Sequence, residues 1–269
     1  MRKNNGNKNK DILLVIDVGN TNIVVGLYKG DELFNHWRLL TSNYRTGDEF
    51  YLLLNMLFYT AGVDPSTIKG CCISSVVPDV NPALIELCVR TFGFKPIMVE
   101  PGIKTGIVLQ VENPKEVGAD RIVNAVAGVE EYGGPLIIID FGTATTFDVI
   151  TDKAEWIGGV IVPGIQLSAE ALFEHCAKLP HVDIAIPNTV IGKNTIDNIR
   201  IGLTYGYADL VEGLVTRIKK ELNTNTKVVA TGGLAPLISK ITKCVDIVDP
   251  LLTLKGLKLI YAKNARGQK

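Results

Sequence analysis

Two stretches of the chain repeat one pattern: a hydrophobic strand that ends in an aspartate, a loop of small and polar residues, and a second hydrophobic strand. They are Ile12–Tyr28, ILLVIDVGNTNIVVGLY, and Pro135–Ile150, PLIIIDFGTATTFDVI. The aspartates Asp17 and Asp140 hold the same place in the two copies and lie 123 residues apart (140 − 17). Because that spacing is close to half of the 269 residues, we predict a chain built from two related halves.

The two loops have the composition of a phosphate-binding site. Gly19 aligns with Gly142, and Asn20, Thr21 and Thr143 beside them carry amide or hydroxyl groups. Such a loop presents backbone N–H groups and hydroxyls to a phosphate, while the aspartate can hold the accompanying cation. An ordinary strand-end turn uses the same residues for its geometry alone. Two copies in one chain favour the phosphate interpretation, with each half offering one loop to a shared cleft.

Composition narrows the class of protein. Hydrophobic residues make up 46% and charged residues 21%, and the formal net charge is zero, which predicts a well-buried core and argues against a nucleic-acid surface. No stretch approaches the roughly 20 apolar residues of a membrane span. The apolar run behind the basic residues 1–10 stops at Asp17, too early for a signal peptide. We expect a soluble, cytoplasmic protein with residues 1–10 disordered and its five cysteines as reduced thiols.

The order of the remaining elements predicts an α/β fold with mixed sheets. Hydrophobic alternation and short apolar runs predict further strands at Asp31–Leu40, Lys69–Val77, Lys95–Val99, Trp156–Val162, Lys227–Ala230 and Val245–Val248. Helical spacing predicts helices at Thr46–Ala61, Pro82–Phe92 with Asn81 as N-cap, Ala119–Tyr132, Leu167–Ala177, Thr195–Leu222, Leu234–Ile241 and Leu251–Ala262.

We place a domain boundary at the end of the irregular segment 101–117, which holds two prolines and two glycines. This gives an N-terminal domain at 11–117, a C-terminal domain at 118–262 and a frayed tail at 263–269. Inside the long predicted helix, Gly202 and Gly206 cost about 1 kcal/mol each relative to alanine. Two explanations stay open: close packing against a helix of a second subunit, or glycines tolerated within one subunit.

Five short motifs in this order resemble the type III pantothenate kinases, members of the actin/Hsp70/sugar-kinase superfamily. They are Asp17-x-Gly19-Asn20-Thr21, Gly118-Ala119-Asp120-Arg121, Asp140-Phe141-Gly142-Thr143-Ala144, Gly158-Gly159-x-x-x-Pro163-Gly164 and Thr231-Gly232-Gly233. The resemblance implies two ribonuclease-H-like domains with a cleft between them. It also implies a homodimer that uses ATP with Mg²⁺, and K⁺ or NH₄⁺, to phosphorylate pantothenate to 4′-phosphopantothenate, the first step towards coenzyme A.

The resemblance also assigns the nucleotide site. Its ATP-binding residues correspond to Asp17, Val18, Gly19, Asn20, Thr21, Asn22, Ile23, Val24, Thr143, Gly232 and Gly233. Asp17 suits Mg²⁺, directly or through water, because magnesium keeps several waters and few carboxylates. Asp140 corresponds to a ligand of the monovalent cation, although the residues alone do not separate this role from that of a second Mg²⁺ ligand.

The resemblance also assigns the residues that bind the molecule to be phosphorylated. The resemblance implies that Asp120 accepts the proton of the pantothenate hydroxyl, and that Gly118, Ala119, Arg121 and Thr195 contact the substrate, Thr195 from the partner subunit. Each charged or polar residue has a structural alternative. Asp120 can stabilise a helix N-terminus, Arg121 can form a surface ion pair, and Thr195 can cap the long helix.

Two other functions remain open at this point. A regulatory or accessory protein can use the same scaffold, because a fold does not fix an activity. A kinase of another small hydroxy acid or sugar would need the same phosphate chemistry.

Overall fold

The computed structural model describes residues 11–42 and 44–265. The predicted disorder of residues 1–10 lies outside the described residues. The tail predicted to fray at 263–269 begins inside the last helix, α7 (Leu252–Asn264), so its first two residues are helical. All five cysteines are free thiols. Within the described part of the chain, no helix is long and apolar enough to cross a membrane.

The chain folds into two compact units. Unit 1 holds the chain up to Gly106, the segment Asn113–Ala127 and the chain from Thr253 onward; unit 2 holds Ile107–Glu112 and Gly128–Leu252. This division differs from the predicted boundary after residue 117. The difference arises because the last helix returns to the first unit, a long-range contact that local sequence patterns do not show.

Unit 1 is built on a five-stranded mixed sheet in the order β3-β2-β1-β4-β5. β1 pairs antiparallel with β2 and parallel with β4, β2 pairs antiparallel with β3, and β4 pairs parallel with β5. The strands are β1 (Ile12–Val18), β2 (Asn22–Lys29), β3 (Glu32–Leu40), β4 (Ile68–Ser75) and β5 (Ile97–Met98). The helices are α1 (Gly47–Thr60), α2 (Asn81–Phe92), the first part of α3 (Ala119–Tyr132) and α7, with short 3₁₀ turns at Pro65–Thr67, Pro78–Val80 and Pro114–Glu116.

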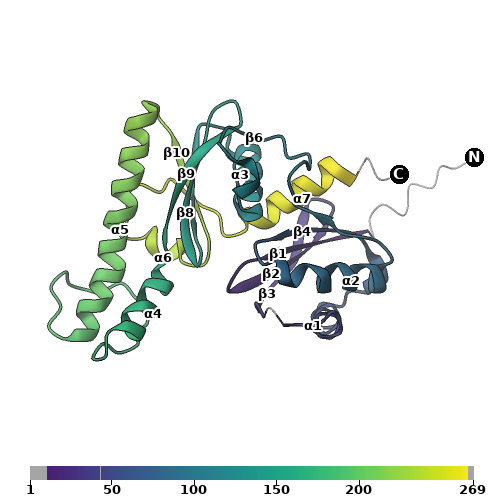
Figure 1. Ribbon diagram of the computed structural model, residues 1–269, viewed down its shortest axis with the longest axis horizontal. Coiled ribbons are helices and arrows are strands. Elements are labelled where there is room, and N and C mark those ends of the chain that lie inside the picture. Colours follow the sequence, from purple (N-terminus) through teal and green to yellow (C-terminus); the bar gives the residue numbers. More distant parts are fainter. Residues whose placement is uncertain (1–10, 43, 266–269) are drawn as a thin grey trace, which may run out of the picture. The chain divides into compact units, whose positions relative to one another are not determined.

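Helices cover both faces of this sheet (Figure 1). On one face, alternate residues of β1 form a core cluster with α1 and α2. On the other face, a Cβ at Gly26 would lie 3.1 Å from Leu254 of α7, and one at Gly70 would overlap Tyr261 of the same helix. The glycines therefore let α7 pack directly on the strands.

Unit 2 repeats the strand order of unit 1 and adds one strand. Its six-stranded sheet has the order β11-β10-β7-β8-β9-β6, so β7 to β11 correspond to β1 to β5 with the same parallel and antiparallel pairings. The strands are β6 (Val108–Leu109), β7 (Leu136–Phe141), β8 (Ala144–Ile150), β9 (Glu155–Pro163), β10 (Lys227–Thr231) and β11 (Ile247–Val248). The prediction of two related halves is confirmed.

One face of the second sheet packs against α4 (Ile165–His175), α5 (Thr195–Leu222) and α6 (Ala235–Ile238), as the buried cluster of this unit shows. Within the unit, Figure 1 shows α5 running along the sheet on the side of α4 and α6. A Cβ at Gly202 or Gly206 of α5 would meet no atom within 4 Å. These glycines therefore do not serve close packing inside the described chain.

At two predicted helices the N-cap residue differs from the structure. Asn81 is the first residue of α2 rather than its N-cap, because the 3₁₀ turn at Pro78–Val80 leads directly into the helix and leaves Val80 at the cap position without a side-chain hydrogen bond. Thr195 is likewise the first residue of α5, and Asn194 is the cap: its Oδ1 accepts the Asp197 N–H at 2.9 Å. The structural alternative for Thr195, a capping role, is therefore wrong.

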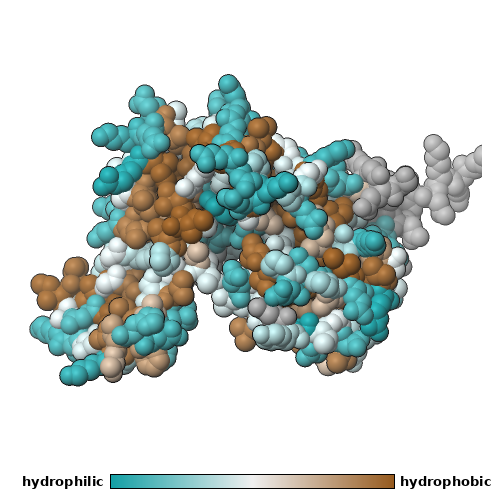
Figure 2. All heavy atoms as spheres, viewed as in Figure 1, coloured by the Kyte–Doolittle hydropathy of each residue, from teal (hydrophilic) through white to brown (hydrophobic). Residues whose placement is uncertain are grey.

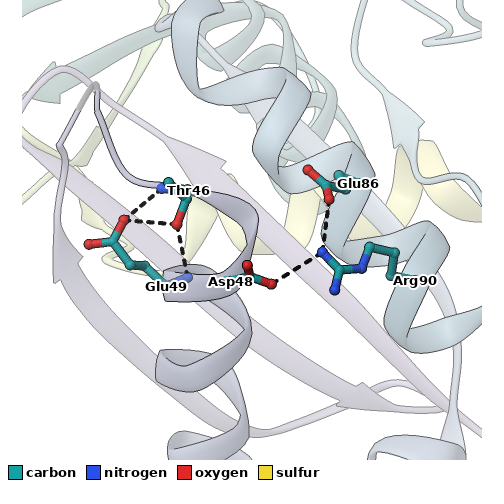
Figure 3. A network of polar contacts seen from close by, with 5 residues as sticks. All are labelled: Thr46, Asp48, Glu49, Glu86 and Arg90. Atoms are coloured by element: carbon teal, nitrogen blue, oxygen red, sulfur yellow. Dashed lines mark hydrogen bonds and ion pairs between the residues drawn. The ribbon is translucent and has the colours of Figure 1, made fainter.

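The start of α1 is held by a reciprocal pair of side chains (Figure 3). Thr46 Oγ1 accepts the Glu49 N–H at 3.3 Å, and Glu49 Oε2 accepts the Thr46 N–H at 2.7 Å. Beside this capping box, Arg90 of α2 lies 3.1 Å from Asp48 and 2.9 Å from Glu86. These ion pairs are exposed and contribute little, so the capping box is the stronger local constraint.

Replacing Thr46 with Ala is expected to lower the free energy of unfolding by about 1 kcal/mol, because the Glu49 N–H loses its acceptor and the Glu49 carboxylate loses the hydroxyl that donates to it. Urea unfolding followed by circular dichroism measures the change. The control is Thr60→Ala, which removes a hydroxyl hydrogen bond from the last turn of α1. Equal stability of the two variants would contradict the assigned role of the capping box.

Candidate functional site

The first aspartate loop joins β1 to β2 in unit 1. Asp17 is the next-to-last residue of β1, and the Gly19 N–H donates to the Asn22 carbonyl at 2.9 Å to close the turn. Thr41, just beyond β3, anchors the loop twice: its N–H donates to Thr21 O at 3.0 Å and its hydroxyl to Gly19 O at 2.7 Å. The loop is thus held at both ends, with Asn20 and Thr21 exposed.

Not every predicted ATP-binding residue of this loop can offer a side chain. Val18 and Ile23 are each 1% exposed and belong to the core cluster of unit 1. Val18 O also accepts the Val76 N–H at 3.0 Å. Val24 pairs directly with Asp17 across the hairpin. Val18 and Ile23 therefore support the loop and can reach a ligand only through their backbone, whereas the half-buried Val24 projects from the same face of the hairpin as Asp17.

Asp120 stands in the first turn of α3, in the same unit. Its Oδ1 accepts the backbone N–H of Arg121 at 2.8 Å. A Cβ at Gly118 would lie 2.5 Å from that Oδ1 and 3.7 Å from Val76 Cγ1, so only glycine leaves room for the carboxylate at this position. Because Val76 also bonds to Val18, the start of α3 lies beside the end of β1. The structure thus brings the Gly118–Arg121 motif and the first aspartate loop together.

The ionisation of Asp120 is set mainly by its burial. Burial raises the pKa of the Asp120 carboxyl above the ordinary aspartate value, while the hydrogen bond from the Arg121 N–H and the charge of Arg121 oppose the shift. If the carboxylate only stabilised the helix N-terminus, we would expect it to be exposed and its pKa to be lowered. A partly desolvated carboxylate with a raised pKa is better suited to accept a proton.

The second aspartate loop joins β7 to β8 in unit 2, where two glycines let the backbone pack closely around the loop. Gly232 has φ +90°, and a Cβ there would lie 2.5 Å from Asp140 Oδ1 and 2.7 Å from the Phe141 backbone. A Cβ at Gly164 would overlap the carbonyls of Gly142 and Thr143, and the Gly164 N–H donates to Thr143 O at 3.0 Å. Asp140, Thr143 and the Gly232–Gly233 loop are therefore neighbours.

Two hydroxyls beside the aspartates were missed as site residues. Thr146 of β8 pairs with Asp140, and Ser74 of β4 pairs with Asp17. The Oγ1 of Thr146 and the Oγ of Ser74 are both buried and have no hydrogen-bond partner among the described residues. Hydroxyls inside otherwise apolar strands were the available signal, but a hydroxyl in a strand also suits ordinary β-structure.

Thr195 lies apart from the second aspartate loop along its own helix. It is exposed, and it precedes Leu203, which lies in the buried cluster against the sheet, by eight residues (203 − 195), about 12 Å of helix. The adjoining residues include apolar side chains at the surface: Val190 is 71% and Ile191 82% exposed. Thr195, the first residue of α5, thus follows a loop with exposed apolar side chains.

The residues present fit the cations that the motifs imply. In the part of the chain that the structure describes, no group of three or more His, Cys, Asp or Glu side chains could hold a metal ion. Mg²⁺ does not need one, because it is usually held by one or two carboxylates, waters and phosphates. Asp17, with the buried Ser74 hydroxyl beside it, suits such an ion. Asp140 and Thr146 offer only oxygen atoms, which suit a monovalent cation.

The strand order repeated in the two sheets defines the fold class, the actin-like fold. The structure is similar to a conserved protein of Campylobacter jejuni described as a Baf family transcriptional activator, with a TM-score of 0.60 and 20% identity over 94% of this chain and 99% of that chain. It is also similar to a ROK hexokinase of Thermus thermophilus, with a TM-score of 0.50 and 14% identity over 93% and 98% of the two chains. Identities this low show the fold alone.

The sequence comparisons are more specific. The sequence profile of the type III pantothenate kinases matches residues 13–217. A type III pantothenate kinase of Geobacillus kaustophilus is 53% identical over 253 residues, which cover 94% of this chain and 98% of that protein. The chain belongs to the type III pantothenate kinase family.

Proposed function

We propose that this chain transfers the γ-phosphoryl group of ATP to the primary hydroxyl of pantothenate and forms 4′-phosphopantothenate, the first step of coenzyme A biosynthesis. Family membership supports the reaction. The single structural observation that carries it is the position of Asp120, a half-buried carboxylate with a raised pKa beside the end of β1 and its aspartate loop. Phosphoryl transfer needs an oriented hydroxyl and neutralised phosphate charge, and this arrangement offers both.

Asp120 accepts the proton of the pantothenate hydroxyl. In a loose transition state that proton leaves late, so the carboxylate mainly orients the hydroxyl until phosphoryl transfer is advanced. Gly118 and Ala119 form the backbone before it. The neighbouring Arg121 supplies a planar fork of N–H donors that suits the carboxylate of pantothenate. Within this motif, Arg121 therefore binds the substrate and Asp120 accepts its proton.

The phosphates of ATP bind to the loop after β1. Asn20 and Thr21 are exposed at a turn that Thr41 holds in place, and N–H groups fixed in such a turn form a site for anionic oxygens. Asp17 holds Mg²⁺ directly or through water. The bound Mg²⁺ neutralises charge on the phosphate oxygens. In unit 2, Thr143, Gly232 and Gly233 are the proposed ATP contacts.

Asp140 binds a monovalent cation, K⁺ or NH₄⁺, together with the hydroxyl of Thr146. Replacing K⁺ with Na⁺ is therefore expected to lower kcat by about tenfold or more, equivalent to ~1.4 kcal/mol, since a smaller ion fits the same oxygens less well. Initial rates in matched chloride salts measure the effect, with N-methylglucamine chloride as the control for ionic strength. Equal rates in all three salts would count against this cation site.

The active form is a homodimer in which Thr195 contacts substrate bound to the partner subunit. Three features support this: Thr195 sits on the first, exposed turns of α5, apolar residues lie exposed beside it, and Gly202 and Gly206 have open space above them. Figure 2 shows hydrophobic residues gathered on the visible surface over α5 and the strands beside it. An exposed apolar surface of this kind is typical of an interface.

Replacing Gly206 with Ala tests the interface. If α5 packs closely on a second subunit, the added methyl is expected to raise the dimer dissociation constant by about tenfold or more, as overpacking does. Sedimentation velocity across a concentration series measures it. Lys220→Ala, on an exposed position fourteen residues further along α5 (220 − 206), is the control. An unchanged dimer with stability raised by about 1 kcal/mol would mean that the glycine is merely tolerated in one subunit.

A cytoplasmic location fits the same proposal. All five cysteines are free thiols, which suits a reducing compartment, and the proposed substrate ATP is found there.

The decisive experiment incubates purified protein with ATP, Mg²⁺, K⁺ and pantothenate and measures 4′-phosphopantothenate by mass spectrometry. Phosphopantothenate formed in proportion to enzyme supports the proposal. Turnover of a different hydroxy acid or sugar, with none of pantothenate, would assign another kinase activity. ATP binding without phosphorylation of any of these acceptors would favour a regulatory protein on this scaffold.

A further inference from the structure

Ser74 is an unexpected residue for its place in the fold. It lies in β4 with 0% of its surface exposed, and its Oγ has no hydrogen-bond partner among the described residues. An unpaired buried hydroxyl destabilises a protein by about 1–3 kcal/mol, and native structures contain few such groups. Cys72 lies two residues earlier on the same face of β4 and is also fully buried. This face of the strand therefore accommodates a less polar side chain of similar size. The hydroxyl of Ser74 therefore calls for a partner.

The register of the sheet shows where that partner must be. Ser74 is the direct parallel neighbour of Asp17, and paired residues of parallel strands project from the same face, about 4.8 Å apart. The strands β1 and β4 both end one residue later. From there the chain reaches Val76, which bonds to Val18 and approaches Gly118 at the start of α3. Ser74 thus lies beside the proposed Mg²⁺ ligand, on the side of the proposed acceptor site.

The second half of the chain repeats this juxtaposition. In unit 2, Thr231 of β10 is the parallel neighbour of Asp140, and it is 2% exposed. Both aspartates at the ends of the central strands therefore have a buried hydroxyl residue on the parallel strand beside them. Because the pairing occurs in both halves, the buried hydroxyl belongs with the aspartate beside it and is not a peculiarity of one strand's sequence.

We propose that Ser74 is a positioning residue of the Mg²⁺–ATP site, whose hydroxyl hydrogen-bonds to a water molecule bound to the Mg²⁺ that Asp17 holds. The inference rests on the proposed function, because it takes the Mg²⁺ site at Asp17 from it. Mg²⁺ keeps most of its waters in proteins. A hydroxyl can both accept from such a water and donate to a neighbouring oxygen, and a water bridges polar groups that are too far apart to bond directly. Ser74 acts through the water, and it does not touch the reacting atoms.

The test compares Ser74→Ala and Ser74→Cys with the wild type. Binding of Mn²⁺, as a probe for Mg²⁺, is followed by electron paramagnetic resonance in the presence of a non-hydrolysable ATP analogue and without pantothenate. Both variants are expected to bind Mn²⁺ about tenfold more weakly, the usual effect of losing a group that orients a metal's ligands. Their unfolding temperatures are expected to equal or exceed that of the wild type, since neither leaves an unpaired buried hydroxyl.

Two further variants separate this role from packing. Ser74→Thr keeps the hydroxyl and is expected to restore most of the Mn²⁺ affinity. Cys72→Ala truncates a buried side chain on the same face of β4 and is expected to leave Mn²⁺ affinity within about twofold of the wild type, because Cys72 lies two residue pairs further from the strand end. Mn²⁺ affinity unchanged in Ser74→Ala would overturn the inference, as would equal losses in Cys72→Ala and Ser74→Ala.

The same measurements distinguish failure of this inference from failure of the proposed function. If the wild type phosphorylates pantothenate while Ser74→Ala keeps full Mn²⁺ affinity, only the role of Ser74 is overturned. If the wild type leaves pantothenate unchanged while Ser74→Ala loses Mn²⁺ affinity, the role of Ser74 stands and the acceptor is a different molecule.

Discussion

Replacing Asp120 with Asn is expected to lower kcat by about 10²- to 10⁴-fold, the usual contribution of a general base, while affinity for ATP stays within about twofold. Asn has no proton-accepting carboxylate, but its Oδ1 can still accept the Arg121 N–H that Asp120 accepts at 2.8 Å. The start of α3 should therefore survive the change. Steady-state kinetics and calorimetric titration with a non-hydrolysable ATP analogue measure the two quantities.

The pH dependence gives an independent check on Asp120. Burial raises the pKa of its carboxyl, and the base must be ionised to accept a proton. The wild-type kcat/KM for pantothenate is therefore expected to fall with decreasing pH at values above the 3.8 of an ordinary aspartate. Unaltered turnover in Asp120→Asn, or a flat profile down to that value, would contradict its role as base.

Replacing Gly232 with Ala is expected to lower kcat on the order of 10²-fold, the effect of misplacing a site by about 1 Å. The methyl would lie 2.5 Å from Asp140 Oδ1 and 2.7 Å from the Phe141 backbone, so the carboxylate or the strand end must shift. The positive φ adds a strain of about 1–3 kcal/mol. Kinetics as a function of K⁺ concentration should show a weakened response to the cation.

The control for that substitution is Gly133→Ala in the same unit. Gly133 also has a positive φ, +70°, but a Cβ there would meet no atom within 4 Å. It is expected to lose stability without losing kcat. Similar kinetic defects in both variants would show that backbone strain, rather than the contact with Asp140, causes the loss.

Most of the fold could be predicted because its signals are local or repeated. The aspartate repeat predicted two related halves, and both sheets share one strand order. The helices Ala119–Tyr132 and Thr195–Leu222 have the predicted bounds, since glycine follows the first and a polar cap residue precedes the second. The Asn81 start could not be read correctly, because the 3₁₀ turn Pro78–Val80 runs directly into the helix and places Val80, not Asn81, at the cap position.

Only those residues of the candidate site that lie in a recognisable sequence motif could be predicted. The Gly118–Arg121 segment and both aspartate loops carry recognisable patterns, and the structure places the Gly118–Arg121 segment beside the end of β1. Ser74 and Thr146 carry none, because their importance depends on which residue lies opposite them on a neighbouring strand. Strand register is a long-range property, and β4 lies some fifty residues after β1 in the chain.

The return of the last helix to the first unit has a consequence for synthesis on the ribosome. One face of the first sheet is covered by α7, whose Leu254 and Tyr261 pack at Gly26 and Gly70. That face stays open until the final residues have emerged, although its strands are among the first made. Domains usually fold in order from the N-terminus. Here the later unit, complete at Leu252, can fold while the earlier one still lacks the helix that closes it.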